Sequence, residues 1–401
     1  MYNIHFELTH LLKHTHTHSE AMIAPFFTTS LVVDLVKDGR VLELEAKREA
    51  LFEMIAMVRD ASKGRRIYMN VRRRHIVDTA INAIMKIEKS ALTRRMSVRF
   101  EGESGVDAGG LTSELYHLFF SQIISTKCPL FVRPEDVENP TFMPALDKDL
   151  LWPQSERLYI GFGRFLVKAI FDGQPVPCPL SSACFKFLLG REPNMSDLAS
   201  FDPQLAHSCR QILDMDDAED MMLDFGDVGG DENRDVTNEN REEYVKAKIH
   251  FVLFESRKRA LRKIKLGFES IKISAHLKLF SATELMSIAC GVRNMTGDDV
   301  ISCLTFSGFP RSSKTPDHLK ELLKSMSKSE LQRFLIFITA QSALPTGTKN
   351  IRISKTSSTS SCPVAHTCFN RLDLPDYSDK DTLARMLRVS LDNLDAGFGL
   401  A

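Results

Sequence analysis

The sequence lacks the features that mark several large classes of protein. Its 401 residues include no run of about 18 apolar residues, so no membrane span is expected. Lysine plus arginine and aspartate plus glutamate both number 52, which leaves no net charge to attract nucleic acid or an anionic membrane surface. Residues 1–19 also lack the basic and then apolar pattern of a signal peptide. These absences favour a cytosolic or nuclear protein with no membrane span and no nucleic-acid partner.

Cysteine motifs are sparse as well. The eight cysteines are scattered and form neither a dense disulfide framework nor paired C-x-x-C motifs. This favours a reducing compartment, and neither a cofactor nor a metal is expected. What the chain has instead is 43% hydrophobic and 26% charged residues, the composition of a globular protein with a sizeable core. Its length allows about two or three domains.

The first part of the chain is predicted to alternate between helices and strands. Apolar residues at helical spacing predict a leading helix over 41–62, and alternation predicts strands over 67–71 and 96–100. The basic run 72–75 could bind phosphate, but no aromatic residues interleave with it, and a solvated edge is favoured. The glycine-rich segment 101–110 carries acidic side chains that would repel an anion, which favours a structural turn.

A break at residues 291–293 is predicted to separate two lobes. Before it, Thr237 has the features of a helix start, and the helix is expected to run to about Arg262. A shorter helix is expected over 281–290. The glycine at the end of that helix marks the boundary.

Beyond the break, helix and strand signals alternate again. Residues 327–330 have the spacing of a capping box that opens a helix. A strand is expected over 368–374, ended by a proline. Ser378 is then expected to cap the final helix.

The stretch 362–370, Cys-Pro-Val-Ala-His-Thr-Cys-Phe-Asn, places thiols beside an imidazole. Cysteine is a nucleophile only as thiolate, and an ordinary thiol with a pKa of about 8.5 is mostly protonated at neutral pH, so it needs polar help. His366 and Thr367 could give that help to Cys368. With Cys362, the same residues could form part of a zinc site, although no fourth ligand is evident, and simple packing is a third interpretation. The spacing alone leaves all three open.

Segments far apart in the chain carry a combined pattern: RFEGESGVDAGGLTSE at 99–114, VTNENREEY at 236–244, parts of 280–291, HTCFNRLDLPDYS at 366–378 and the ending GFGLA at 397–401. In this order they resemble the HECT domain, the catalytic domain of one class of ubiquitin ligases. The resemblance covers roughly residues 65–401. Its most specific part is the segment that contains Cys368.

The resemblance implies an α+β fold of two lobes. A mainly helical N-lobe over 65–290 would dock a ubiquitin-conjugating enzyme, and a small α/β C-lobe over 294–401 would carry the catalytic cysteine. A flexible hinge at 291–293 would join them. Residues 1–64 would form an N-terminal extension with a leading helix.

By the same resemblance, Cys368 takes ubiquitin from the conjugating enzyme as a thioester and passes it to a lysine of a protein substrate. His366 and Thr367 would shape the surroundings of the thiol. Asn370 and Asp373 would anchor the loop by hydrogen bonds. Whether His366 acts as a base or only orients the loop is left open by the spacing.

Other positions need separate comment. Phe398 would help to position the ubiquitin-loaded lobe, with simple packing of a C-terminal aromatic as the alternative. Cys362 stands where the family usually has leucine; it could compete for the thioester or form a disulfide with Cys368, but an inert small side chain is favoured. Segment 221–235 looks contracted where the family has longer strand-forming sequence in its docking region.

The contraction motivates an alternative function, a catalytically weak HECT-like interaction protein with impaired docking. A cysteine hydrolase that uses Cys368 and His366 is a further alternative. It is weaker, because hydrolase partners usually come from distant segments and need an orienting third group. Neither the protein substrates nor the ubiquitin linkage can be read from the sequence.

Overall fold

The computed structural model describes residues 44–61, 64–103, 107, 109–125, 128–134, 141–150, 153–291, 295–339, 343–344, 351–356 and 362–392. The fold is mixed α+β, mostly helical with small sheets, as predicted. Within these ranges no helix is both long and apolar enough to cross a bilayer. Phe398 and residues 292–294 lie outside the described residues.

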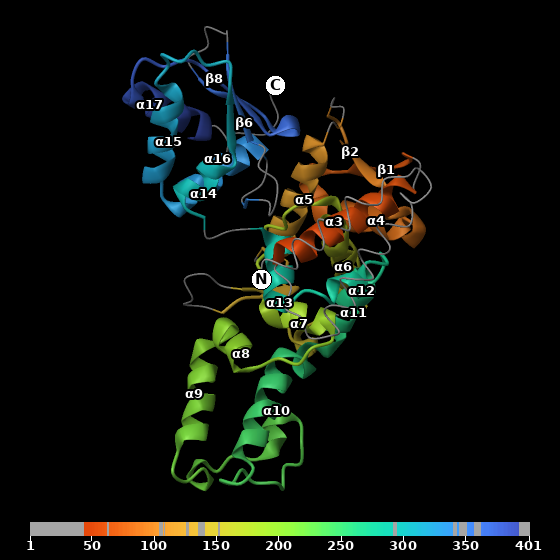
Figure 1. Ribbon diagram of the computed structural model, residues 1–401. Helices are drawn as coiled ribbons and strands as arrows, with labels where there is room; N and C mark the ends of the chain where they lie inside the picture. Colours follow the sequence, from red (N-terminus) through yellow and green to blue (C-terminus); the bar gives the residue numbers. More distant parts are fainter. Residues whose placement is uncertain are drawn as a thin grey trace, which may run out of the picture.

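The buried side chains form two hydrophobic cores. The first core is built between Ala50 and Cys290, and the second between Met295 and Leu391. Figure 1 shows the elements of the second core, coloured cyan to blue, as a group of their own, while three green helices project from the first core. The two cores meet in sequence at the predicted break.

The first core combines helices with two small sheets. β1 and β2 pair in parallel, and β3 pairs with β4 antiparallel. The predicted leading helix and both predicted strands are present. The elements are α3 (Leu44–Asp60), β1 (Arg66–Val71), α4 (Ile76–Lys86), β2 (Arg95–Phe100), α5 (Gly110–Ile123), β3 (Phe131–Val132), β4 (Met143–Pro144), α6 (Gln154–Asp172), α7 (Ser182–Leu189), α11 (Lys258–Phe268), α12 (Ser274–Leu277) and α13 (Ala282–Cys290).

Helix α6 is buried at the centre of the first core. Its Phe165 ring lies 4.2 Å from that of Phe119 on α5. On another side α6 packs against α11 through glycine. A Cβ atom at Gly163 would lie only 2.0 Å from the carbonyl oxygen of Ile264, so the two backbones approach more closely than side chains would allow.

Segment 101–110 was predicted to be a structural turn; its residues 104–106 and 108 lie outside the described residues. The Asp107 carboxylate accepts hydrogen bonds from the backbone N–H of Val98 on β2 at 2.7 Å and of Gly109 at 2.8 Å. In the basic run before it, Arg73 pairs with Glu103 at 2.8 Å and with Glu114 at 2.6 Å. The hydrogen bond from Arg73 lowers the pKa of Glu103. The guanidinium is therefore bound by carboxylates of the fold itself, which argues against a phosphate site.

The projecting part consists of α8 (Met195–Phe201), α9 (Pro203–Asp214) and α10 (Arg241–Leu253) with the 3-10 helices Glu219–Met221 and Phe225–Val228. The prediction of a single helix over 237–262 is wrong: α10 ends at Leu253 and α11 begins at Lys258. The chain bends at Phe254, whose ring packs 5.1 Å from Phe187 in an edge-on contact. The buried Arg257 then donates to a backbone carbonyl of β4 at 3.1 Å. These tertiary contacts outweigh continuous helical periodicity.

The second core is a four-stranded sheet packed against helices. The strand order is β5-β6-β8-β7, with only β7 antiparallel to its neighbour among the described strands. The capping box over 327–330 is confirmed. The final helix is capped by Asp379, which accepts from the Thr382 N–H at 2.8 Å, and not by Ser378 as predicted. The elements are α14 (Gly297–Ser302), β5 (Leu304–Ser307), α15 (Thr315–Ser325), α16 (Lys328–Thr339), β6 (Ile351–Lys355), β7 (Val364–His366), β8 (Arg371–Leu374) and α17 (Lys380–Asp392).

Candidate active site

The candidate site is the hairpin formed by β7, a 3-10 turn over Thr367–Phe369, and β8. The prediction of a strand over 368–374 is therefore wrong for its first residues: Cys368 occupies the middle of the turn, and β8 begins only at Arg371. The backbone turns back at Asn370, which has a φ of 47°. Asparagine tolerates this left-handed conformation better than most residues, so the turn can close over few residues.

A hydrogen-bonded group joins the two strands next to the turn. His366 lies opposite Arg371 in the antiparallel register, and Asp373 is two residues further along the same face. The His366 Nε2 atom lies 3.0 Å from Asp373 Oδ2, and the Arg371 Nη2 atom donates to the same oxygen at 3.1 Å. The Arg371 Nε atom lies 3.0 Å from Asp373 Oδ1. One carboxylate thus fixes both a histidine and an arginine beside Cys368.

This arrangement settles part of what was expected of the loop. Asp373 does anchor it by hydrogen bonds, as predicted. Asn370 acts through its backbone: its N–H donates to the Thr367 carbonyl at 3.4 Å, and its carbonyl accepts from Arg352 of β6 at 2.9 Å. The Thr367 side chain is half-buried. Phe398 cannot be placed, because it lies outside the described residues.

The base of the hairpin is tied to the second core. The buried Ser390 hydroxyl of α17 donates to the Pro363 carbonyl at 3.2 Å. Just after β8, the Asp376 carboxylate accepts from Ser313 at 2.5 Å and from Lys355 at 3.0 Å. The hydrogen bond from Ser313 is the main cause that lowers the pKa of Asp376. The hairpin is thus held at both ends, and its turn packs against α16 and α5.

Cys362 lies at the start of the hairpin and is half-buried. Burial, with a smaller effect of Cys362, raises the pKa of Tyr377 to about 12. Among the described side chains, no cluster of three His, Cys, Asp or Glu residues could hold a metal ion. The Cys368 side chain is not among them, and the zinc interpretation stays a prediction.

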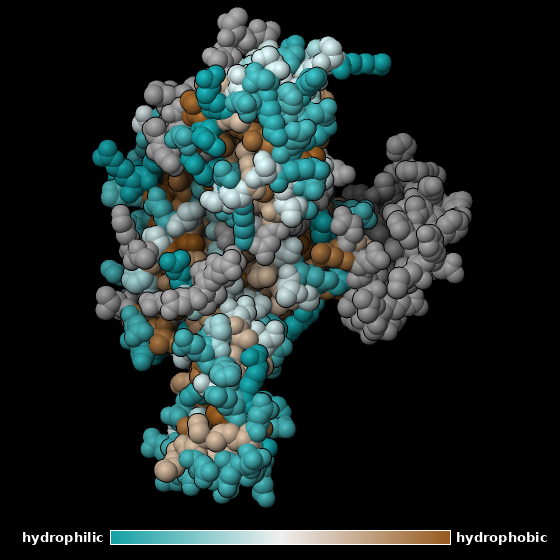
Figure 2. Space-filling model, turned by 90° about the vertical axis from the view of Figure 1, so that its left-hand side faces the viewer, coloured by the Kyte–Doolittle hydropathy of each residue, from teal (hydrophilic) through white to brown (hydrophobic). Residues whose placement is uncertain are grey.

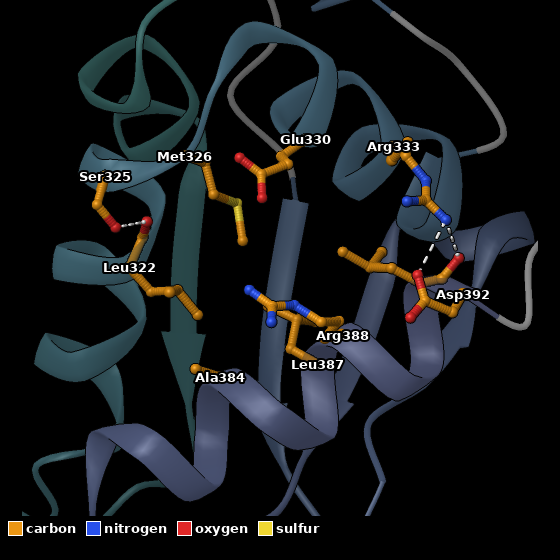
Figure 3. A pocket seen from close by; sticks show the side chains of 10 residues that line it. Leu322, Ser325, Met326, Glu330, Arg333, Ala384, Leu387, Arg388 and Asp392 are labelled. Atoms are coloured by element: carbon orange, nitrogen blue, oxygen red, sulfur yellow. Dashed lines mark hydrogen bonds and ion pairs between the residues drawn. The ribbon is translucent and has the colours of Figure 1, made fainter.

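A pocket of about 240 Å³ lies elsewhere in the second core, between α15, α16 and α17. In Figure 3 the Arg388 side chain reaches into it from α17, while Arg333 pairs with Asp392 at its rim. Its lining residues come from these helices and none comes from the hairpin. The turn of the candidate site is instead partly open to solvent: Phe369 is 69% exposed, and His366 and Thr367 are half-buried. An open site of this kind suits a macromolecular substrate better than an enclosed small molecule.

The HECT-domain (ubiquitin-transferase) model matches residues 117–401 of the chain. The chain belongs to the HECT family. The matched segment includes the hairpin, the second core and the part of the first core that follows residue 117.

Several HECT ligases are similar to the chain over most of its length. The bifunctional serine/threonine-protein kinase/NEDD4-like E3 ubiquitin-protein ligase of Dictyostelium discoideum is 30% identical over 456 aligned positions, which cover 94% of this chain and 24% of that protein. E3 ubiquitin-protein ligase UPL1 of Arabidopsis thaliana is 26% identical, with 92% of this chain and 11% of that protein covered. E3 ubiquitin-protein ligase HUWE1 of Mus musculus is 25% identical, with 98% of this chain and 9% of that protein covered. The chain spans at most 24% of the length of these relatives.

Arg371 belongs to the hydrogen-bonded group of the candidate site, but no role for it was predicted from the sequence. It stands within the motif, but its spacing to Asp373 says only that both side chains share a face of one strand. The contact to His366 depends on the register between β7 and β8, which the length of the turn sets. No signal in the sequence gives that length.

Asp373→Asn is expected to slow transfer of ubiquitin from the loaded HECT domain roughly tenfold, because charge-assisted hydrogen bonds contribute about 1.5–3 kcal/mol and these are partly exposed. The measurement is single-turnover discharge of the thioester between pH 6 and 9. Asp381→Asn, an exposed aspartate on α17, is the matched control. An Asp373→Asn variant with the wild-type rate and pH profile would show that the carboxylate does not position His366 for the reaction.

Proposed function

We propose that the chain is a ubiquitin-protein transferase that carries ubiquitin on Cys368 and delivers it to a lysine of a protein substrate. The single observation that carries this is the hairpin, whose turn contains Cys368 next to the strands that hold the His366 and Asp373 pair. Family membership supports it. The chain covers a minor part of its relatives, so the activity of the whole protein, its substrates and its conjugating enzyme belong to the proposal.

The reaction would proceed through two acyl transfers. The Cys368 thiolate attacks the thioester carbonyl of the loaded conjugating enzyme, forms a new thioester, and releases the thiolate of that enzyme. A deprotonated lysine amine then attacks the carbonyl carbon on Cys368. An amide bond forms, the Cys368 thiolate leaves, and the proton lost by the attacking nitrogen passes to a base or to water. Covalent catalysis of this kind divides one difficult step into two easier ones.

We propose that His366 serves the second transfer. With its proton on Nε2, a neutral imidazole donates to Asp373 and keeps the Nδ1 lone pair as an acceptor. In this tautomer Nδ1 can take the proton of the attacking amine or orient it. Asp373 is then a positioning residue that acts through His366.

The two cores support a two-lobed arrangement, with an N-lobe over 65–290 and a C-lobe over 294–401. In the described residues, hydrophobic packing stops at Cys290 and resumes at Met295. Gly291 between them has a φ of 69°, which favours glycine, and a Cβ atom there would lie 2.7 Å from the Leu344 carbonyl oxygen. We propose that residues 291–293 are the hinge that lets the C-lobe move between the conjugating enzyme and the substrate.

The projecting part offers a docking surface for the conjugating enzyme. Met221 and Met222 are exposed near its end, and the Met222 side chain is 92% exposed. Met222 also has a φ of 48°, an unfavourable conformation for methionine that indicates a constrained, functional position. In Figure 2 the end of the projecting part shows moderately hydrophobic surface among hydrophilic neighbours. An exposed apolar patch with a polar rim is typical of a protein interface.

The contraction predicted at 221–235 is consistent with this part of the structure. In the described part of this segment, the only strand-like pairing is an isolated bridge between Asp224 and Asp235. These two residues lie on either side of the second 3-10 helix. Shorter strand pairing does not remove the exposed methionines. The chain therefore keeps an apolar surface that could dock a partner, which weighs against the interaction protein with impaired docking.

Met222→Asp is expected to raise the conjugating-enzyme concentration needed for half-maximal charging roughly tenfold, because an interface hot spot contributes more than about 1–2 kcal/mol. Aspartate tolerates the left-handed backbone, so the fold is not strained by the change. Leu266→Asp, which alters an exposed leucine on α11, is the control and should change little. Equal weakening by both variants would contradict docking at Met222.

The decisive test of the proposed function is a charging assay. The chain is mixed with activating enzyme, a panel of conjugating enzymes, ATP and ubiquitin, and separated with and without thiol reductant. A ubiquitin adduct that reductant removes is the expected result. Absence of an adduct across the whole panel would favour a catalytically silent interaction protein, and hydrolysis of ubiquitin esters without conjugating enzyme would favour a hydrolase.

A reducing compartment would suit this chemistry. A reactive thiol must stay reduced to accept ubiquitin. We propose the cytosol or the nucleus as the site of action. Imaging of the tagged chain in cells would test this.

A further inference from the structure

The sheet of the second core has one apolar face and one polar face. Ile351, Ile353, Leu372 and Leu374 are buried on the side of the helices. The opposite side, called here the outer face, is formed by two rows of residues in register across the strands. One row is Thr305, Arg352, Arg371 and His366, and the next is Ser307, Ser354, Asp373 and Val364.

The outer face is accessible and leads directly to the Cys368 turn. Its residues are exposed or half-exposed. The Arg352 N–H donates to the Asn370 carbonyl at 2.9 Å, so β6 is fixed against the residue that closes the turn. An acceptor protein that presents a lysine to Cys368 would therefore lie against this face or its edge.

Some charged side chains on the outer face have ion-pair partners, and Arg352 has none among the described residues. Arg371 is bound by Asp373, which also holds His366. The nearby Asp376 is bound by Ser313, Thr315 and Lys355. No carboxylate of the described residues pairs with the exposed Arg352. Arg352 is the register partner of Arg371 on the neighbouring strand, about 4.8 Å away, so both side chains start side by side from the same face.

We propose that the outer face binds the acceptor protein and that Arg352 selects lysines with an acidic side chain one or two residues away. This rests on the proposed transfer from Cys368 and adds the substrate class. Arg352 and Arg371 place two cationic side chains on this face, in register on neighbouring strands. The same cations repel a lysine that lacks acidic neighbours, whereas a flanking carboxylate pairs with Arg352 and keeps the peptide in place.

The test compares two acceptor peptides that differ only in charge. One carries Asp on either side of a single lysine, and the other carries Asn. The full chain is loaded with ubiquitin, the loading reaction is stopped, and discharge is followed against peptide concentration in 50 mM and 300 mM salt. Free lysine serves as the acceptor that reports the chemical step alone.

Wild type is expected to favour the Asp peptide about fivefold at low salt, and less at high salt because screening weakens exposed charge pairs. Arg352→Gln should abolish the preference while discharge to free lysine stays within about twofold, and Arg352→Lys should retain part of the preference. Arg388→Gln, which removes the exposed arginine of the pocket in Figure 3, is the matched control and should keep it. An unchanged preference in Arg352→Gln, or none in wild type, would overturn the proposal.

A second measurement separates this proposal from the proposed function. Fluorescence anisotropy of the labelled Asp and Asn peptides is measured on the uncharged full chain, with the same variants. In one outcome, the chain fails to be charged while the Asp peptide still binds better than the Asn peptide and this difference depends on Arg352. That result would contradict the proposed transfer function and support binding of acidic peptides by the outer face. If charging is normal and neither binding nor discharge depends on Arg352, the selectivity proposal falls alone.

Discussion

A Cys368→Ser variant is expected to replace the reductant-sensitive ubiquitin adduct with a weak adduct that resists reductant, and Cys368→Ala is expected to form none. A serine oxygen can form an ester, but a hydroxyl is far less nucleophilic than a thiolate at neutral pH. We expect the transfer rate to fall by roughly three orders of magnitude or more, as when other enzymes lose a covalent nucleophile. Gel-based charging with fluorescent ubiquitin measures both the amount and the chemistry of the bond.

Cys362 provides the matched control within the same hairpin. It is a half-buried thiol six positions before Cys368, and Cys362→Ser should leave charging within about twofold of wild type. Normal charging of Cys368→Ala would disprove the site assignment. Loss of the adduct only in Cys362→Ser would move the nucleophile to the other end of β7. Peptide mapping after peroxide treatment tests separately whether the two cysteines form a disulfide.

Gly163→Ala is expected to destabilise the first core by about 3 kcal/mol or more. The new methyl group would lie 2.0 Å from the Ile264 carbonyl oxygen and 2.8 Å from the Phe268 nitrogen. Both are backbone atoms of α11, so no side chain can rotate away and the two helices must separate. Alanine is itself the better helix former by about 1 kcal/mol, so the measured loss will be smaller than the cost of separation. Urea or thermal denaturation followed by circular dichroism measures it.

Gly161→Ala on the same helix is the control for this effect. There the new methyl group meets the Cδ1 atom of Ile81 at 2.3 Å, the far end of a side chain that can change rotamer. The gain in helix propensity should offset much of that cost, and the net change should stay within about 1 kcal/mol. If Gly163→Ala and Gly161→Ala proved equally stable, close backbone contact between α6 and α11 would not be needed.

Local signals in the sequence predicted many elements of the fold. Alternation identified β1 and β2, and the spacing of Ser327 and Glu330 identified a capping box, because these patterns depend on neighbouring residues alone. The break between α10 and α11 was not predictable in this way. It depends on the packing of Phe254 against Phe187, two residues far apart in the sequence.

The candidate site also combines features that the sequence predicts with features that only the folded structure shows. Cys368 could be singled out only when the motif around it was combined with distant segments, since its own spacing left packing, zinc and catalysis open. The turn that displays Cys368 was predicted as a strand, because the conformation of Asn370 is a property of one residue and leaves no periodic signal. The Arg371 contact follows from strand register. The role of Phe398 stays a prediction.

Helix α3 shows where an independently folding unit must begin. Its Leu51 and Ile55 are buried in the first core, and its polar side chains form two further links. Lys47 binds Glu284 of α13 at 3.0 Å, and Arg59 binds Asp172 of α6 at 3.2 Å. The segment matched to the family starts 57 residues after α3 ends, at residue 117. A recombinant fragment cut at that position, or at residue 65, would leave the α3-binding surface uncovered and prone to aggregation.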